Sequence, residues 1–365
     1  MIAHSKLTTL LAAAVAMQAL PIDAALAQGG DQQTLRGQRV AIYNLVGSIR
    51  LEGGTGSDVS VTVERKGSDG ARLKVQSGVI GGRETLRVIY PDDRIVFEGN
   101  EGNRGRWGRT QVDVSSDGTF GDDRDDRDDR RRSDRVEIVS SGSGFRGYAD
   151  VRVSVPKGKE IEVHLAAGEA VVSNVEGDIV VDVHAADVTT THTRGELTLD
   201  TGSGDVGVTD AEGRVTLDAG SGGATLAGVK GSELRLDTGS GSVKASGIDV
   251  DELWGDTGSG RVRLTEVRAK DITLDSGSGS VELELLADVD RLKIDAGSGS
   301  VTVGIPESLG AALDIDTGSG GIDVDVPISV TRRDRDGLVG TIGDGRGRIE
   351  IDSGSGGVRL RRSGR

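Results

Sequence analysis

The sequence is poor in residues that cross-link, kink or stack polypeptide chains. Its 365 residues include no cysteine, five prolines and few aromatic residues, namely two Trp, three Tyr and three Phe. The lack of cysteine excludes a disulfide scaffold, so packing must stabilise the fold. Collagen is excluded as well, because proline is scarce and glycine does not recur at every third position.

Charge and apolar content narrow the class further. Lys and Arg number 44 and Asp and Glu 59, which gives a formal net charge of −15. An acidic chain with few aromatic rings lacks the basic grooves and stacking platforms that bind nucleic acid. Hydrophobic residues make up 35% of the chain and alternate with polar ones, which is typical of β-strands and not of a disordered chain. With 58 glycines, we expect a β-rich protein with many tight turns.

Residues 1–27 have the pattern of a secretory signal peptide. Lys6 supplies a positive charge, Leu7 to Leu20 form a mostly apolar stretch, and Ala25-Leu26-Ala27 is a small-x-small cleavage site. An uncleaved N-terminal anchor is the alternative. No later segment approaches the length of apolar run that spans a membrane, so we expect no transmembrane segment in the mature chain. The pattern predicts an exported protein that is periplasmic, cell-surface or secreted.

A five-residue string, Asp-x-Gly-Ser-Gly, recurs eight times. Successive copies are 18, 19, 19, 19, 20, 21 and 36 residues apart, and the doubled last interval indicates an interruption near 327–345. A nearly fixed period of this length is the signature of a repeat architecture. The copies begin at Asp200, Asp218, Asp237, Asp256, Asp275, Asp295, Asp316 and Asp352.

Aliphatic residues flank each copy, three and one residues before the Asp and six and eight residues after it. Of the 32 positions so defined, only Gly255 is not aliphatic. Such alternation predicts strands with one buried face, and Gly-Ser-Gly predicts a tight turn between them. A further apolar position recurs in the segment that returns to the next copy, at Val229, Ile248, Val267 and Leu286.

A unit of about 19 residues buries too little apolar surface to offset the entropy of ordering its own backbone. Equivalent strands must therefore stack side by side in parallel, about 4.8 Å apart. The sequence predicts an all-β fold, a single-stranded parallel β-solenoid (β-helix) with coils of about 19 residues.

Weaker copies precede the regular ones. His164 and His184 each follow a valine as Asp200 follows Leu199, and Ser140 takes the Asp position in another copy. We expect all three to lie in solenoid coils. The four arginines within 359–365 are expected to guard an outer edge of the sheet.

The domain organisation follows from these patterns. Residues 28–97 alternate and are predicted to supply N-terminal β coils. Residues 98–135 are rich in glycine and charge and end in a mixed Asp/Arg run, so we expect a flexible charged loop. Residues 136–365 are predicted to form the β-solenoid of Asp-x-Gly-Ser-Gly repeats, interrupted near 327–345.

The segment Ala41-Ile42-Tyr43-Asn44-Leu45-Val46-Gly47-Ser48-Ile49, then Val61-Thr62-Val63-Glu64 and the repeated Leu-x-Leu-Asp-x-Gly-Ser-Gly-x-Val, together resemble a known family. This is the bacterial putative-adhesin family, exported β-strand-repeat domains of unknown function. The resemblance covers nearly the whole mature chain. It implies a β-solenoid and a surface or envelope location, and it supplies no catalytic residues.

The repeated Asp is the most suggestive polar position, since stacked coils would align it in a column. One interpretation is that each carboxylate accepts hydrogen bonds from its own Gly-Ser-Gly turn; the other is a calcium ladder. The turn role is favoured, because Ser140, His164 and His184 occupy the same position in earlier copies.

Other candidate sites are weaker. His164 and His184, with His192 nearby, lack the further ligands of a metal site. Trp254 is expected to fill the space left by Gly255, with an exposed ring for a sugar or partner as the alternative. The sequence assigns no catalytic residue, no cofactor-binding residue, no metal ligand and no cofactor.

Three functions remain. The first is a non-enzymatic exported solenoid, an adhesin or a structural or interaction protein of the cell envelope, whose partner is an unknown protein or glycan and not nucleic acid. The second is a polysaccharide lyase or hydrolase, using the mixed-charge run or the loop Arg332-Arg333-Asp334-Arg335-Asp336. The third is a calcium-stiffened surface stalk. The first is favoured because neither charged segment has a recognisable spacing of catalytic roles, so we expect no enzyme.

Overall fold

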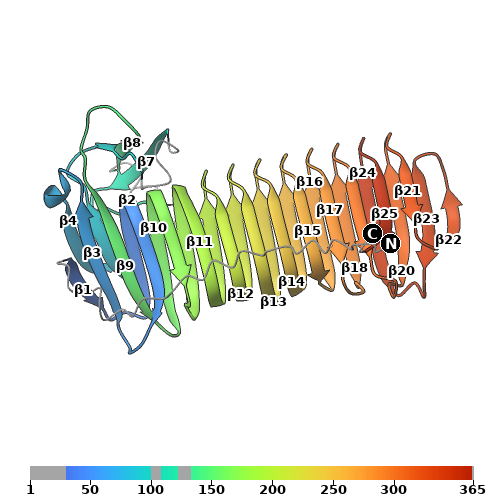
Figure 1. Ribbon diagram of the computed structural model, residues 1–365, viewed down its shortest axis with the longest axis horizontal. Coiled ribbons are helices and arrows are strands. Elements are labelled where there is room, and N and C mark those ends of the chain that lie inside the picture. The colour runs from blue at the N-terminus through green and yellow to red at the C-terminus, as the bar shows by residue number, and fades with distance from the viewer. Residues whose placement is uncertain (1–29, 100–107, 122–132, 364–365) are drawn as a thin grey trace, which may run out of the picture.

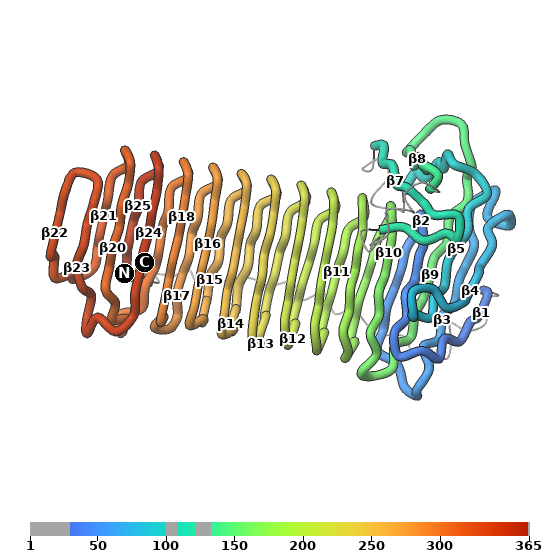
Figure 2. The backbone as a smooth tube through the Cα atoms, turned by 180° about the vertical axis from the view of Figure 1, so that it is seen from behind, coloured from blue at the N-terminus to red at the C-terminus, as the bar shows by residue number. Residues whose placement is uncertain are grey.

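The computed structural model describes residues 30–99, 108–121 and 133–363 (Figure 1). The described chain forms a long rod of stacked β-coils, with a small three-stranded sheet beside its N-terminal end (Figures 1 and 2). The predicted signal peptide lies outside the described residues. Within the described ranges, no helix is long and apolar enough to cross a membrane.

The strands fall into two groups along the rod. The N-terminal end contains β1 (Asp31–Leu35), β2 (Arg39–Gly54), β3 (Val59–Lys66), β4 (Lys74–Ile80), β5 (Arg83–Ile89), β6 (Arg94–Val96), β7 (Arg109–Ser115), β8 (Ser133–Val139) and β9 (Tyr148–Pro156), with a 3-10 turn, η2 (Gly70–Arg72). The repeating part contains β10 (Lys159–Ser173), β11 (Gly177–Thr201), β12 (Val206–Ala219), β13 (Ala224–Thr238), β14 (Val243–Thr257), β15 (Val262–Arg268), β16 (Asp271–Ser276), β17 (Val281–Leu285), β18 (Arg291–Ala296), β19 (Val301–Ile305), β20 (Ala311–Thr317), β21 (Ile322–Asp325), β22 (Ser329–Arg333), β23 (Gly337–Ile342), β24 (Gly347–Ser353) and β25 (Val358–Arg362).

The coils stack in parallel register, as the repeat predicts. Asp218 of β12 lies opposite Asp237 of β13, and Asp237 opposite Asp256 of β14. The aliphatic residue before each Asp points inward, so that Leu217 and Leu236 are almost completely buried. These inward side chains form one hydrophobic core along the rod. The predicted parallel β-solenoid is confirmed.

The glycines of the Gly-Ser-Gly turns are required by the close approach of neighbouring coils. None of them has a positive φ, so a need for left-handed backbone does not explain them. A Cβ atom on Gly260 would overlap the carbonyl oxygen of Gly241 in the preceding coil, and the same overlap recurs at Gly241 and Gly279. Because the obstacle is backbone on both sides, side-chain movement cannot relieve it.

A second turn, at the opposite corner of the coil, does need a left-handed backbone. In this column φ lies between 52° and 71°, and only two members are glycine. Asn and Asp tolerate this conformation better than other residues with a side chain, whereas Glu is unfavourable. The column consists of Asn174, His192, Asp210, Gly228, Gly247 and Glu266.

Glu266→Gly is therefore expected to stabilise the protein. Glu266 has φ 55°, and glycine removes a Cβ penalty of about 1 kcal/mol. Thermal unfolding should show a higher midpoint for the variant. The matched control is Glu252→Gly within β14, where glycine should cost about 0.5–1 kcal/mol. A lower midpoint for Glu266→Gly would contradict this interpretation of the corner.

The C-terminal coil does not lie at the end of the rod. β24 pairs in parallel with β18 on one side and with β20 on the other, and β25 likewise lies between β19 and β21. The last coil of the sequence is thus inserted between two earlier ones, as the deepest red coil shows in Figures 1 and 2. After β19 the chain skips the next coil position and forms the outer coil with β20 and β21. It then returns and fills the skipped position with β24 and β25.

The doubled interval in the repeat is an antiparallel hairpin. β22 and β23 pair with each other, and β23 pairs antiparallel with β20, so this hairpin caps the rod. The expectation that the C-terminal arginines guard an outer edge is wrong, because β25 is internal. Arg359 pairs instead with Asp323 at 2.9 Å, and Arg361 with Glu284.

The N-terminal end repeats this arrangement. β2 lies between β10 on one side and β5 and β9 on the other, although about 90 residues of chain separate β2 from β9. Beyond β5, the sheet continues with the antiparallel strand β4. Beyond β9, it continues with the antiparallel strand β3, which in turn pairs antiparallel with β1. β2 at one end of the rod, and β24 and β25 at the other, are thus each tied into the stack inside the outermost strands.

Two expectations for the region between β5 and β9 are wrong. Residues 109–115, expected in a flexible loop, form β7, and Ser140 lies outside the solenoid, just after β8. β6, β7 and β8 make a separate sheet, because β8 pairs with these two strands and with no solenoid coil. Most of the mixed Asp/Arg run falls outside the described residues.

Two predicted core positions differ in detail. Leu286 is 43% exposed, and Leu285 instead lies opposite Val267 and is buried. At Gly255 the missing side chain is compensated by Leu274, whose Cδ2 atom lies 2.9 Å from where a Cβ would stand. Trp254, expected to fill this space, points outward, where the Arg235 guanidinium stacks 3.7 Å from its ring centre.

Candidate functional site

The repeated aspartates form an unbroken column along one side of the rod. Each lies opposite the next in register, and neighbouring strands are about 4.8 Å apart. Asp352 of the inserted coil stands between Asp295 and Asp316, so the column stays continuous where the chain order is broken. In space the order is Asp200, Asp218, Asp237, Asp256, Asp275, Asp295, Asp352 and Asp316.

These carboxylates differ from most outward charges on the coils because they face like charges. Elsewhere, opposite charges pair from coil to coil, as in Arg194–Glu212 at 2.6 Å and Arg263–Glu282 at 2.6 Å. From Asp218 onward, no aspartate of the column forms an ion pair with a described Lys or Arg. From Asp218 onward the column is therefore a row of exposed or partly exposed carboxylates that form no ion pair with a described Lys or Arg, although the charges of Arg235 and Lys293 offset part of the rise in pKa of Asp237, Asp275 and Asp352.

Crowding of like charge changes how these groups titrate. Partial burial, and then the charges of Asp218 and Asp256, raise the pKa of Asp237 above its ordinary 3.8. The pKa of Asp275 is raised in the same way by burial and by Asp256 and Asp295. Burial and Asp295 likewise raise the pKa of Asp352, which shows that the inserted coil belongs to the same electrostatic unit.

The raised pKa values predict a specific pH dependence. A carboxyl with a raised folded-state pKa binds protons more tightly in the folded protein than in the unfolded chain. Its contribution to folding stability is therefore fully present below the unfolded-state pKa and is lost as the pH rises through the folded-state pKa. Asp256 repels both Asp237 and Asp275. Asp256→Asn should therefore stabilise the protein by about 0.5–1 kcal/mol at pH 7, with much less gain at pH 3.5.

Thermal unfolding at the two pH values checks this prediction. Asp249→Asn is the matched control, because the register places Asp249 between Lys230 and Arg268. Loss of the Asp249 charge should give no gain in stability at pH 7. Equal effects of the two substitutions would contradict the repulsion that we assign to the column.

From Asp218 onward, no hydrogen bond joins an Asp of the column to its Gly-Ser-Gly turn within the described residues, although the sequence favoured that role. In the copies that have Thr or Ser after the Asp, the hydroxyl of this next residue, which points inward, bonds to the turn: Thr317 donates to the carbonyl of Gly320 at 2.8 Å, and Ser353 to that of Gly356 at 2.8 Å. Successive residues of a strand point to opposite faces, so the residue after an outward Asp must face the core. This alternation is the sequence signal that could have identified the inward residue. The buried residues at this position are Thr201, Ala219, Thr238, Thr257, Ser276, Ala296, Thr317 and Ser353.

The column begins at the base of the solenoid with different residues. His164 of β10 lies opposite Tyr43 of β2 and opposite Asp182 of β11. Asp182, not His184, occupies the column position in β11. Gly202 stacks on His184, and these two coils are offset by 18 residues. The same offset places Asp200 over Asp182. The prediction that His184 occupies the Asp position is therefore wrong, whereas His164 does occupy it.

His164 is buried and held on several sides. Its ring stacks on Tyr43 with centroids 4.4 Å apart, and its Nδ1 lies 3.1 Å from Asp182 Oδ2. Burial alone would lower the pKa of His164, but the hydrogen bonds and charges of Asp182 and Glu162 raise it overall. Phe120, which follows β7, packs edge-on against the same ring, so this cluster anchors the small sheet to the rod.

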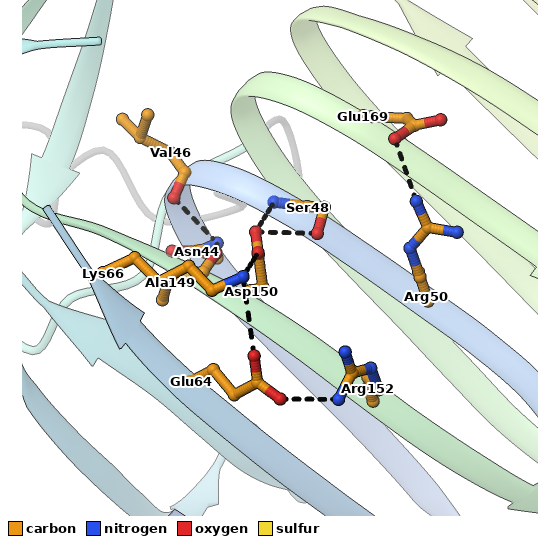
Figure 3. Close-up of polar contacts among 10 residues, drawn as sticks. All are labelled: Asn44, Val46, Ser48, Arg50, Glu64, Lys66, Ala149, Asp150, Arg152 and Glu169. Atoms are coloured by element: carbon orange, nitrogen blue, oxygen red, sulfur yellow. Dashed lines mark hydrogen bonds and ion pairs between the residues drawn. The ribbon is translucent and has the colours of Figure 1, made fainter. Parts of the chain in front are cut away.

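A polar network closes the first coil beside this cluster (Figure 3). Asp150 of β9 accepts hydrogen bonds from the backbone N–H and hydroxyl of Ser48 at 3.1 and 2.8 Å, and from Lys66 at 2.6 Å. The buried Asn44 donates to the carbonyl of Ala149 at 2.9 Å. These groups satisfy one another, so the network is structural.

The sequence pattern of the Toastrack DUF4097 family matches residues 128–361, well over half of the chain. The chain belongs to this family. The match begins before β9 and extends through the inserted C-terminal coil, so the Toastrack region includes the whole aspartate column.

Two further comparisons add little to the Toastrack assignment. No curated protein matches the chain in sequence. A solved structure described as a "putative cell adhesion protein" from Clostridium sporogenes matches 92% of this chain and 100% of its own, at 10% identity and a TM-score of 0.20. A similarity at that level carries no argument about this protein.

The remaining candidate residues are not brought together in this Toastrack chain. Within the described residues, no group of three or more His, Asp or Glu side chains could hold a metal ion. His192 lies 3.4 Å from Asp210 on the surface. The Arg332 to Asp336 segment lies in the exposed hairpin at the far end, where Arg332 pairs with Asp334 at 3.2 Å.

Proposed function

We propose that the protein is an exported, non-enzymatic interaction protein of the cell envelope or surface, and that its aspartate column binds a partner segment rich in Lys and Arg. The partner is a protein, because flexible basic side chains can follow carboxylates that repeat about every 4.8 Å. The rod serves as a rigid support that keeps these carboxylates in register.

One observation carries this proposal. From Asp218 onward, the column aspartates face like charges and form no ion pair with a described Lys or Arg, whereas Arg194–Glu212, Arg263–Glu282 and similar pairs neutralise neighbouring rows. Unpaired like charges in adjacent strands cost stability, and a positively charged ligand relieves that cost. Their clustering on one side of the rod is what a basic partner needs for electrostatic recognition.

Export is a separate part of the proposal. The signal-peptide pattern of residues 1–27 and the resemblance of the repeat motifs to exported β-strand-repeat domains support it. If the segment is cleaved as proposed, N-terminal sequencing of the secreted or periplasmic protein should begin at Gln28. Recovery of the intact N-terminus in an exported fraction would contradict cleavage.

Binding of a labelled decalysine peptide tests the role of the column. Fluorescence anisotropy with the full mature chain should show saturable binding that weakens as NaCl increases. The triple variant Asp237→Asn/Asp256→Asn/Asp275→Asn should lose at least about tenfold in affinity, since each charge contributes on the order of 1 kcal/mol in water.

The control removes the same charge elsewhere. Asp249, Glu252 and Asp290 are exposed and lie off the column, so Asp249→Asn/Glu252→Gln/Asp290→Asn should change the affinity less than about threefold. Equal losses in the two triple variants would show that net charge alone attracts the peptide. That result, or no binding by the unmodified protein, would overturn the proposed role of the column.

A further inference from the structure

The two ends of the rod carry strands with an open edge. Among the described residues of the rod's sheet, β4 pairs only with β5, β22 only with β23, and the five-residue β1, which carries Asp31, only with β3. Figures 1 and 2 show β4 and β22 at opposite ends of the molecule. An open edge presents unpaired N–H and C=O groups that can pair with a strand of another chain.

The open edges are protected to different degrees. All five residues of β22 are exposed, and Arg332 and Arg333 place two positive charges on this short strand, which disfavours pairing. β4 is longer, has the sequence Lys-Val-Gln-Ser-Gly-Val-Ile, and carries charge only at Lys74. Its Val79 is 74% exposed, the highest value among the large hydrophobic residues of the described chain.

The outward groups of β4 follow from its register with β5. Ile80 and Arg83 flank the two-residue turn Gly81-Gly82 and face each other. Since antiparallel pairs alternate in hydrogen bonding, every second residue back from Ile80 bonds inward to β5. The backbone groups of Val75, Ser77 and Val79 therefore point to the open edge.

This edge is complementary to itself. If two copies of β4 pair antiparallel about a two-fold axis at Ser77, Val75 of each copy lies opposite Val79 of the other. Cross-strand pairs of β-branched residues stabilise a sheet. Lys74 then lies opposite Ile80, so no like charges meet. By contrast, pairing of β4 with β22 of another copy would bring Lys74 towards Arg332 and Arg333, which disfavours end-to-end chains.

We propose that two copies of the chain associate through β4, in antiparallel pairing centred on Ser77, to form a symmetric dimer with both C-terminal caps pointing outward. The β2–β5–β4 sheet then continues from one copy into the other. A single pair of short edge strands buries little surface, so the dimer is expected to be weak and reversible, in the micromolar range. This dimer is independent of the aspartate column, which lies along the rod.

Sedimentation velocity of the mature chain between about 1 and 200 μM tests the dimer. The sedimentation coefficient should rise with concentration. Val79→Lys removes the apolar pair, and Ser77→Pro removes an outward N–H without breaking a bond to β5; each should weaken association at least about tenfold. Val330→Lys, at the opposite end, should leave it unchanged.

Cross-linking gives a second readout, because the chain has no cysteine of its own. A short bis-maleimide should convert Ser77→Cys into a covalent dimer, whereas Ser329→Cys in β22 should remain monomeric. A chain that stays monomeric at the highest concentration overturns the proposal. So does association abolished by Val330→Lys but not by Val79→Lys, which would indicate end-to-end assembly instead.

Discussion

Replacing Gly260 by alanine is expected to destabilise the middle of the solenoid by about 3–5 kcal/mol, a large effect for a single methyl group. The added Cβ would overlap the carbonyl of Gly241 in the coil below. Relief requires the coils to separate, which weakens hydrogen bonds such as that from Ser259 N–H to the carbonyl of Gly239. Ordinary overpacking in a core costs less, because side chains can move aside.

Trp254 fluorescence during urea unfolding provides the measurement, since Trp254 precedes this turn in the same coil. Trp107→Phe removes the other tryptophan. The control is Gly207→Ala in β12, where a Cβ would lie 3.9 Å from its nearest described neighbour and should stabilise the strand by about 0.5–1 kcal/mol. Costs below about 1 kcal/mol for Gly260→Ala would contradict the requirement for glycine between coils.

Ile351→Asp is expected to loosen two coils at once. Ile351 is fully buried in β24 and lies opposite Ile294 of β18 and Ile315 of β20. An unpaired carboxylate at this position should destabilise the C-terminal region by at least about 4 kcal/mol. Because the coil is inserted, the effect should reach neighbours on both sides.

Hydrogen exchange measured by mass spectrometry locates this effect. Exchange should accelerate in both 291–296 and 311–317, while β12 and β13 keep their protection. Arg348→Gln, on the exposed side of the same strand, is the control and should change neither segment. Protection that is lost in 311–317 alone would contradict the position of β24 between its two neighbours.

The repeat made the solenoid predictable, but it could not give the order of the coils in space. Parallel stacking depends on the alternation of buried aliphatic residues, which the sequence displays directly. The coils at Asp295, Asp316 and Asp352 carry nearly the same pattern, so any of them can stack on any other. The doubled interval indicated an interruption, but only long-range pairing determines that the chain passes over a position and returns.

The aspartate column was predictable in position but not in role. Its alignment follows from the register, whereas the turn bonds depend on the inward Thr or Ser, whose importance only the packed turn reveals. The Gly-Ser-Gly glycines were likewise expected as turn residues, yet the overlap that a Cβ would make with the neighbouring coil shows that coil spacing requires them. Packing within the turn decides the first case and contact between neighbouring coils decides the second.

The inserted C-terminal coil, β24 and β25, keeps the aspartate column continuous to the end of the rod. Disulfide formation tests this insertion directly in a chain without cysteine. Ser355 lies one coil from Ser298, as its backbone N–H donates to the carbonyl of Gly297 at 3.1 Å, whereas Ser319 lies beyond it, on Gly354. Neighbouring coils, about 4.8 Å apart, are within disulfide range, and coils twice as far apart are not. Under mild oxidation, Ser298→Cys/Ser355→Cys should form an intramolecular disulfide and Ser298→Cys/Ser319→Cys should not. Cross-linking of only the second pair would show that the coils stack in chain order and would contradict the account.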